Sequence, residues 1–461
     1  MPISRRSVLV GSAGLAAGAL AMRAGSAAAA APTDLRIDTH QIEVYGKSAT
    51  RYRVFQPDGT LGLFLDEGDA FFVRLTNDLK VPTLVHWHGM TEPWRQDGVP
   101  YLSNEPLEPG GSAEYLFSAM PPGTRWMHSH FGLQEQDLLA APLIIRERAA
   151  IGAGLQEVVV LLEDFSFTPP EEIFKALRSA KPDMGDTDAS KGPDLNDVTY
   201  GAFLANERTL DDPDVIAVEP NAEVRLRIIN ASTSSNYWID LGHLEGRLVA
   251  VDGNPIEPMA VRRIPLAVAQ RADVILRVPS GQAAPVLARA EGRAMQSGVI
   301  LRPTGADVSK ISVKTDTETP RVTLEQELHL VPKSPLARRP VDRVVPVALT
   351  GQMMGYVWNM PINGLVGMPA EAARGERIEI SFENRTGMSH PMHLHGHLFQ
   401  IVEIDGKRFS GAIRDTILVT PGTRVTVALD ADNPGLWAFH CHNLYHLAAG
   451  MFSTLTYRGF A

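Results

Sequence analysis

The only cysteine of this 461-residue chain lies in the stretch His440-Cys441-His442-Asn443-Leu444-Tyr445-His446-Leu447-Ala448-Ala449-Gly450-Met451. An electron-transfer copper site takes two imidazoles, one thiolate and a distant axial thioether. Cys441, His446 and Met451 supply three of these four ligands. Neighbouring side chains of a strand point to opposite faces, so Cys441 should face one way and the two adjacent histidines the other. The stretch therefore predicts two copper sites on the two sides of one strand.

Ten of the fourteen histidines gather in four short clusters, of which the stretch above is the last. Two clusters lie in the first third of the chain, two in the last third, and none between. Histidines at i and i+2 share one face of a strand, so we expect a metal cluster where the first and last parts of the chain meet. Eight imidazoles suit three copper ions at this interface: His86, His88, His128, His130, His393, His395, His440 and His442.

His390 lies an odd number of residues before His393, and Pro391 favours extended backbone at His390. It can therefore face away from the cluster. We expect His390 to complete the mononuclear site with Cys441, His446 and Met451.

Short runs of alternating apolar and polar residues, bounded by turn residues, predict β-sandwich modules. A turn followed by a strand that ends in asparagine occurs three times, ending at Asn77, Asn230 and Asn384. We interpret this as three copies of one unit in an all-β chain. The expected domains are residues 32–148, 149–320 and 321–461, and a polar insertion at 168–196 should contain a short helix near residues 171–179.

The first 31 residues have the features of a twin-arginine export signal. Arg5 and Arg6 precede an apolar run that is too short to span a membrane, and small residues at Ala28 to Ala30 offer cleavage sites. We therefore expect export by the twin-arginine machinery to the periplasm or beyond, and a monomeric mature chain without a membrane span. The formal charge of −10 argues against a nucleic-acid partner, which requires a basic face.

The four histidine motifs, His-Trp-His-Gly, His-Ser-His, His-Pro-Met-His-Leu-His-Gly-His and the stretch that opens this section, resemble those of three-domain multicopper oxidases. This family includes laccases and bacterial copper-tolerance oxidases. The resemblance covers nearly the whole mature chain. It implies three cupredoxin-like Greek-key sandwiches and four copper ions. It assigns type 1 copper to His390, Cys441, His446 and Met451, type 2 copper to His86 and His393, and the type 3 pair to His88, His128, His130, His395, His440 and His442.

The resemblance also implies a reaction. A reducing substrate gives single electrons to the type 1 copper through an exposed edge of His446 or His390. Cys441 passes them to the cluster, where four electrons reduce O2 to water. Asp97 matches a family carboxylate near the type 2 copper that delivers protons, although Asp-Gly is also a common turn pair. Several relatives carry a glutamate at the position of Leu447, so proton delivery here should depend more on Asp97 and water.

The electron donor stays open. Six methionines of the last unit lie near the type 1 motif in sequence, and thioethers favour Cu(I). Scattered methionines are, however, more often ordinary members of the core. Cu(I), Fe(II), phenols and aromatic amines therefore remain possible electron donors. The six methionines are Met353, Met354, Met360, Met368, Met388 and Met392.

The sequence leaves two other classes of protein open. A copper-tolerance cuprous oxidase, or a copper-binding protein with little activity on organic substrates, is one alternative. A copper nitrite reductase is a weaker one, because its chain has two such units and fewer histidine clusters. The isolated His40, His243 and His329 are expected to be structural. His397 is expected to be structural as well, although it lies an even number of residues after His393 and His395 and could therefore face the cluster.

Overall fold

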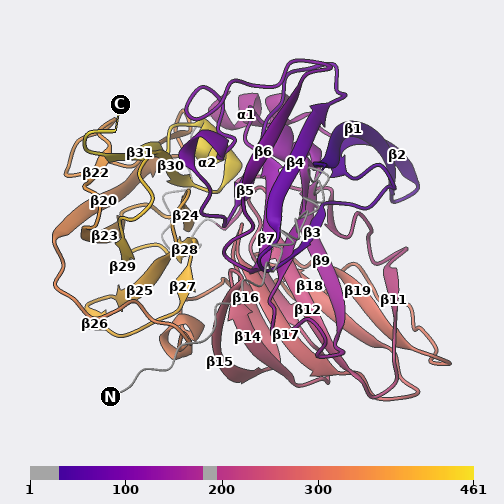
Figure 1. The fold of residues 1–461 in the computed structure, drawn as a ribbon. Coiled ribbons are helices and arrows are strands. Elements are labelled where there is room, and N and C mark those ends of the chain that lie inside the picture. Colours follow the sequence, from indigo (N-terminus) through magenta and orange to yellow (C-terminus); the bar gives the residue numbers. More distant parts are fainter. Residues whose placement is uncertain (1–30, 180–194, 461) are drawn as a thin grey trace, which may run out of the picture.

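The computed structural model describes residues 31–179 and 195–460. Three β-sandwiches follow one another along the chain, each built from two sheets. In Figure 1 the first lies at the upper right, the second at the lower right and the third at the left. The fold is all-β with three cupredoxin-like domains, as predicted. The domain limits at 148 and 320 remain predictions.

The first sandwich pairs a sheet of order β2-β1-β4-β6 with a sheet of order β3-β8-β7-β5. Two 3-10 turns, η1 (Trp94–Gln96) and η2 (Gln134–Asp137), follow β5 and β7. The strands are β1 (Thr33–Val44), β2 (Lys47–Phe55), β3 (Leu63–Asp66), β4 (Ala70–Asn77), β5 (Val85–His88), β6 (Ser112–Ser118), β7 (Gly123–Ser129) and β8 (Ala140–Arg146).

The second sandwich pairs sheets of order β10-β9-β12-β17-β14-β15 and β11-β19-β18-β13-β16. Helix α1 (Pro170–Ser179) confirms the helix predicted in the insertion. The strands are β9 (Gln156–Phe165), β10 (Ala202–Ala205), β11 (Asp214–Val218), β12 (Glu223–Asn230), β13 (Tyr237–Asp240), β14 (Gly246–Val251), β15 (Asn254–Val261), β16 (Arg263–Leu266), β17 (Arg271–Arg277), β18 (Ala284–Ala290) and β19 (Gln296–Pro303).

The third sandwich follows the turn η4 (Gln326–His329). It pairs a sheet of order β21-β20-β23-β29-β25-β26, with β27 beside β25, and a sheet of order β22-β31-β30-β24-β28. Its helix is α2 (Leu444–Ala448). The strands are β20 (Arg343–Gln352), β21 (Val357–Asn359), β22 (Ala370–Ala372), β23 (Arg377–Asn384), β24 (His390–Leu394), β25 (Phe399–Ile404), β26 (Lys407–Arg408), β27 (Ile413–Arg414), β28 (Thr416–Val419), β29 (Arg424–Asp430), β30 (Leu436–Cys441) and β31 (Phe452–Tyr457).

The three asparagine-ended strands of the sequence repeat are β4, β12 and β23, and they hold equivalent places. Each pairs in parallel with the first long strand of its sandwich. Asn77, Asn230 and Asn384 are all buried. Each Oδ1 accepts the backbone N–H two residues on, and each Nδ2 donates to a carbonyl four or five residues on and to a second, more distant carbonyl. The repeated asparagine therefore ends the strand and orders the turn after it, because its amide satisfies three buried backbone groups.

The apolar cores fill the space between the paired sheets. Within the described residues, the structure contains no helix that is long and apolar enough to cross a membrane. The predicted export signal falls on residues 1–31, of which residues 1–30 lie outside the described part, as do residues 180–194 of the insertion.

Candidate metal centre

A group of three side chains that could hold one metal ion, His390, Cys441 and His446, lies on one side of β30. Cys441 Sγ is 3.7 Å from Nδ1 of His390 and 3.7 Å from Nδ1 of His446, and the two Nδ1 atoms are 3.1 Å apart. His390 begins β24, the strand beside β30, and His446 lies on α2, whose first turn is capped by the Asn443 side chain. Met451 is fully buried directly after this helix, and its backbone oxygen accepts the Cys441 N–H.

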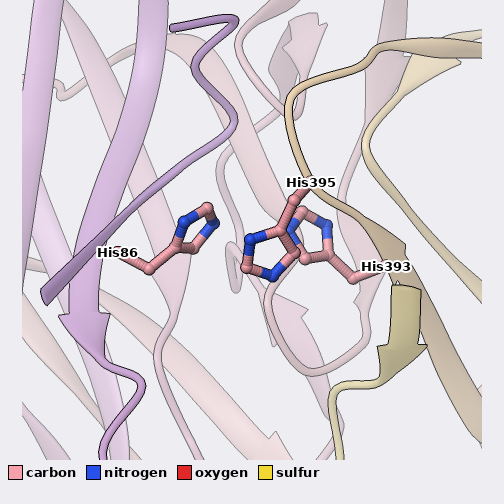
Figure 2. Close-up of side chains that lie close together, drawn as sticks. All are labelled: His86, His393 and His395. Carbon is pink, nitrogen blue, oxygen red and sulfur yellow. The ribbon is translucent and has the colours of Figure 1, made fainter. Parts of the chain in front are cut away.

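The other face of the same strand carries the second group of histidines. His440 Nε2 lies 3.3 Å from His130 Nε2 and 3.0 Å from His395 Nε2, and His442 Nε2 lies 3.3 Å from His128 Nε2. His86, His393 and His395 form a further group whose ligand atoms lie within 4.8 Å of one another. Figure 2 shows these three rings directed toward one another, His86 from β5 of the first sandwich and the other two from the third. The eight predicted histidines thus meet between the first and third sandwiches.

The orientation of the rings fits bound metal ions. The Nδ1 atoms of His86, His128, His393 and His440 each lie within 3.1 Å of a backbone carbonyl, so each Nδ1–H has an acceptor and the Nε2 lone pair points inward. Three inward nitrogens are buried without any hydrogen-bond partner: Nε2 of His86, Nε2 of His393 and Nδ1 of His88. Buried acceptors that converge without a donor are costly, and a cation satisfies them.

Burial also keeps His88, His393, His395 and His440 neutral. Desolvation, followed by the neighbouring histidines, lowers the pKa of His88, His393 and His395 well below the usual value. Burial lowers the pKa of His440 to about 3. A neutral imidazole is the form that binds a metal. Burial raises the pKa of the Cys441 thiol, so binding of a metal there must displace its proton.

The Asp97 side chain lies between His86 of the first sandwich and His395 of the third. It follows the turn η1, and Gly98 after it has a positive φ of 83°, so the local turn expected for this pair is present. The side chain is fully buried, and its Oδ1 lies 2.9 Å from His86 Nδ1 and 3.0 Å from His395 Nδ1. The carboxylate thus joins a histidine assigned to type 2 copper to one assigned to type 3 copper. Its role in proton delivery stays a prediction.

Three further carboxylates near the cluster were not predicted. Asp415 Oδ1 lies 3.0 Å from His88 Nε2. Glu135, in η2, lies 3.3 Å from His128 Nδ1 and lines a water-sized cavity that Leu447 also lines. Glu92 is buried with no hydrogen donor on either oxygen, and burial beside Asp97 raises the pKa of its carboxyl well above the usual value. Glu135 belongs to the Gln134-Glu135-Gln136 triplet, which begins four residues after His130. Asp415 and Glu92 have no comparable local signal in the sequence.

The histidines of the mononuclear site have no exposed edge, so that expectation was wrong. His390 and His446 are fully buried. The hydroxyl of Thr386 lies 2.7 Å from His390 Nε2, and Asp197 Oδ2 lies 2.8 Å from His446 Nε2. The ring of Trp358 lies 4.2 Å from the His446 ring, and the Tyr356 hydroxyl donates to Asp197. Trp358 comes from β21 and Tyr356 from the turn before it, Thr386 from the loop between β23 and β24, and Asp197 from the second sandwich. Together they separate the site from solvent.

The remaining histidines lie elsewhere. His397 is buried between the backbone oxygen of His395, at 3.0 Å, and the Tyr457 hydroxyl, at 2.6 Å. His40 pairs with Glu207, His243 is exposed, and His329 ends η4.

Comparisons with known proteins give the family. Three multicopper oxidase family models match residues 60–150, 156–290 and 338–459. The multicopper oxidase MmcO of Mycobacterium tuberculosis is 33% identical over 85% of this chain and 80% of its own length. The chain belongs to the multicopper oxidase family.

Other relatives agree with this assignment. A copper resistance protein A homologue of Pseudomonas syringae pv. tomato is 26% identical over 91% of each chain. Among solved structures, the laccase from Botrytis aclada aligns with a TM-score of 0.75 at 22% identity, covering 93% of this chain and 88% of that one. The chain is therefore an oxidoreductase that couples oxidation of a reducing substrate to reduction of O2.

Proposed function

We propose that this multicopper oxidase holds four copper ions and that its preferred electron donor is the cuprous ion. The ligand assignment is the one given from the sequence: type 1 at His390, Cys441, His446 and Met451, with the eight interface histidines holding the other three ions. The convergence of these buried rings, with three inward nitrogens left unpartnered, supports it. Bound copper would supply one-electron uptake at the first site and reduction of O2 to water at the second.

The residues of the chain then have separate tasks. Cys441 and its two neighbours connect the two sites covalently, since Cys441 faces one site while His440 and His442 face the other. Asp97 orients His86 and His395 and stands where protons are consumed. Trp358, Tyr356 and Asp197 keep water and bulky molecules away from His390 and His446.

The choice of donor rests on where the methionines lie. Met360, Met388 and Met392 are buried in the core, which agrees with a structural role. Met353, Met354 and Met368 are instead 41%, 58% and 45% exposed. Three exposed thioethers on one sandwich are unusual for a surface and are the ligands that Cu(I) prefers.

These exposed methionines belong to two loops that contact residues near the proposed type 1 site. Met353 and Met354 lie in the turn that leads to Tyr356, whose N–H donates to the Met353 carbonyl. The Met368 carbonyl accepts from Ser453, two residues after Met451. From Tyr356, a hydrogen-bonded chain continues through Asp197 to His446 Nε2. A metal ion bound at these thioethers would thus be connected to a type 1 ligand.

An aromatic donor is the second candidate, because Leu365 and Val366 are 58% and 65% exposed in the loop before Met368. Steady-state O2 consumption with Cu(I), Fe(II) and a phenol, in the wild type and in the triple variant Met353→Leu, Met354→Leu and Met368→Leu, separates the two. Leucine keeps the apolar surface and removes the sulfur. We expect the KM for Cu(I) to rise while turnover of the phenol stays the same.

The matched control is Leu365→Ala with Val366→Ala, which should affect only the phenol. Equal kinetics of the triple variant and the wild type with Cu(I) would exclude the thioethers as the entry point. A wild-type copper content of about four per chain is required for the whole assignment, whereas about two would favour a nitrite-reductase-like protein.

A further inference from the structure

The second sandwich supplies none of the predicted copper ligands, yet one of its side chains reaches the cluster. Arg271, the first residue of β17, is fully buried. Its guanidinium donates to both oxygens of Asp415, at 2.7 Å to Oδ1 and 2.5 Å to Oδ2. Asp415 lies between β27 and β28 of the third sandwich, next to the strand that carries His393. A bidentate pair of this kind fixes both the position and the plane of the carboxylate.

Asp415 in turn holds two of the clustered histidines. Its Oδ1 lies 3.0 Å from His88 Nε2, and its backbone oxygen lies 2.8 Å from His393 Nδ1. In both rings the opposite nitrogen, His88 Nδ1 or His393 Nε2, is the one left buried and unpartnered. The direction of these two inward lone pairs therefore depends on where Asp415 sits.

Arg271 also ties the three sandwiches together at this point. Its Nε donates to the carbonyl of Thr124 on β7, the strand that carries His128. Its remaining N–H groups donate to the carbonyls of Ala269 and Asp252. All five guanidinium N–H groups are thus used, which only an arginine can achieve.

Backbone geometry beside His88 makes room for this contact. Gly89 has a φ of +86°, and a Cβ placed on it would lie 2.6 Å from Arg271 Nη2 and 2.8 Å from Asp415 Oδ2. The ion pair therefore packs directly on the backbone that follows a predicted copper ligand.

We propose that Arg271 is a positioning residue for the copper cluster, and that the second sandwich takes part in building the cluster through the Arg271–Asp415 pair. The inference rests on the proposed assignment of His88 and His393 as ligands. Outer residues that orient metal ligands typically change metal affinity by about 10- to 100-fold. We expect Arg271→Met to lower the affinity of the cluster for copper by this factor and to leave the blue type 1 copper in place.

Arg227 offers a matched control. It is also a fully buried arginine of the second sandwich, on the neighbouring strand β12, and it also touches Thr124. Its partners are Asp273, Glu147 and Glu157, not cluster residues. Arg227→Met removes a buried charge at the same inter-sandwich interface without reaching the histidines.

The experiment compares Arg271→Met, Arg271→Lys, Arg227→Met and the wild type by copper content after dialysis and by electron paramagnetic resonance. Arg271→Lys keeps the charge, so it preserves folding even if the methionine variant does not, but a single ammonium cannot hold both oxygens of Asp415. We expect both Arg271 variants to show an altered type 2 signal and lowered cluster copper, with type 1 absorption retained, and Arg227→Met to keep the wild-type type 2 signal.

An unchanged type 2 signal and full copper content in Arg271→Lys would overturn the inference. Equal losses in Arg227→Met would do so too, because the effect would then be general weakening of the interface. A wild-type protein without four copper ions would instead overturn the proposed function itself, whatever the variants show.

Discussion

Asp97→Asn tests whether a buried carboxylate delivers protons at the cluster or only orients its ligands. The substitution keeps the shape of the side chain and removes the group that ionises. In the wild type, Oδ1 lies 2.9 Å from His86 Nδ1 and 3.0 Å from His395 Nδ1, and Oδ2 lies 3.2 Å from His395 Nδ1. Asparagine can still accept at one oxygen, but its amide nitrogen would face a donor.

The structural cost follows from these contacts. Hydrogen bonds to a charged acceptor contribute about 1 kcal/mol more than neutral ones. The carboxylate accepts from one ring only, that of His395, because His86 donates to the Asp97 backbone oxygen. The loss is therefore about 1 kcal/mol, or about 5-fold in copper affinity. A proton donor in place contributes about 10²- to 10⁴-fold in rate. If Asp97 serves both purposes, copper should remain bound while reoxidation of the reduced protein by O2 slows by the larger factor.

Rapid mixing of the fully reduced variant with O2, together with copper analysis of the same sample, measures both quantities. Reduction by substrate should be nearly unchanged, since Cys441 lies between that step and the cluster. Asp164→Asn is a suitable control, because Asp164 is equally buried but accepts from Thr233 and Ser235. Reoxidation at the wild-type rate in a fully loaded Asp97→Asn protein would leave Asp97 an orienting residue. Slow reoxidation with copper missing would show that the affinity estimate is wrong.

Three further outcomes are expected. Cys441→Ser should lose the blue absorption and the oxidase activity together, and a blue variant would contradict the type 1 assignment. Met451→Leu should stay blue with a raised redox potential, measured by titration, because the axial thioether tunes the site without being its main ligand. Burial raises the pKa of Glu92 above its ordinary 4.5, so the folded copper-free protein keeps a proton that the unfolded chain has lost. The stabilisation of the folded state by this proton should therefore be full at pH values below the ordinary pKa of Glu92, and it should fall as the pH rises. Thermal unfolding against pH should show this slope reduced in Glu92→Gln, and an unchanged slope would exclude Glu92 as its source.

The convergence of the clustered histidines could be predicted from sequence because their geometry is local. Residues two apart on a strand share a face whatever the rest of the fold does, so His440, Cys441 and His442 sort themselves onto two sides without knowledge of their partners. The repeated asparagines are similar, since each bonds mainly to the turn that follows it.

The groups that surround those histidines depend on packing between distant strands. Asp415 reaches His88 across 327 residues, and Arg271 reaches Asp415 across 144. Neither Asp415 nor Arg271 belongs to a recognisable sequence motif. In the sequence, nothing distinguishes Asp415 from the other acidic residues or Arg271 from the other arginines. The expectation of an exposed His446 was wrong for the same reason. Trp358 and Asp197, which cover His446, belong to another hairpin and to another sandwich.

The pairing of His130 with His440 and of His128 with His442 joins residues 310 and 314 positions apart. With a single cysteine, the chain can form no intrachain disulfide. Metal ions held by these pairs would act as cross-links that close a loop containing the entire middle sandwich. Closing so long a loop restricts the unfolded chain strongly. Loaded protein should therefore melt in one cooperative transition, and metal-free protein in separate, lower ones. Copper supply would then set the lifetime of the folded chain as well as its activity.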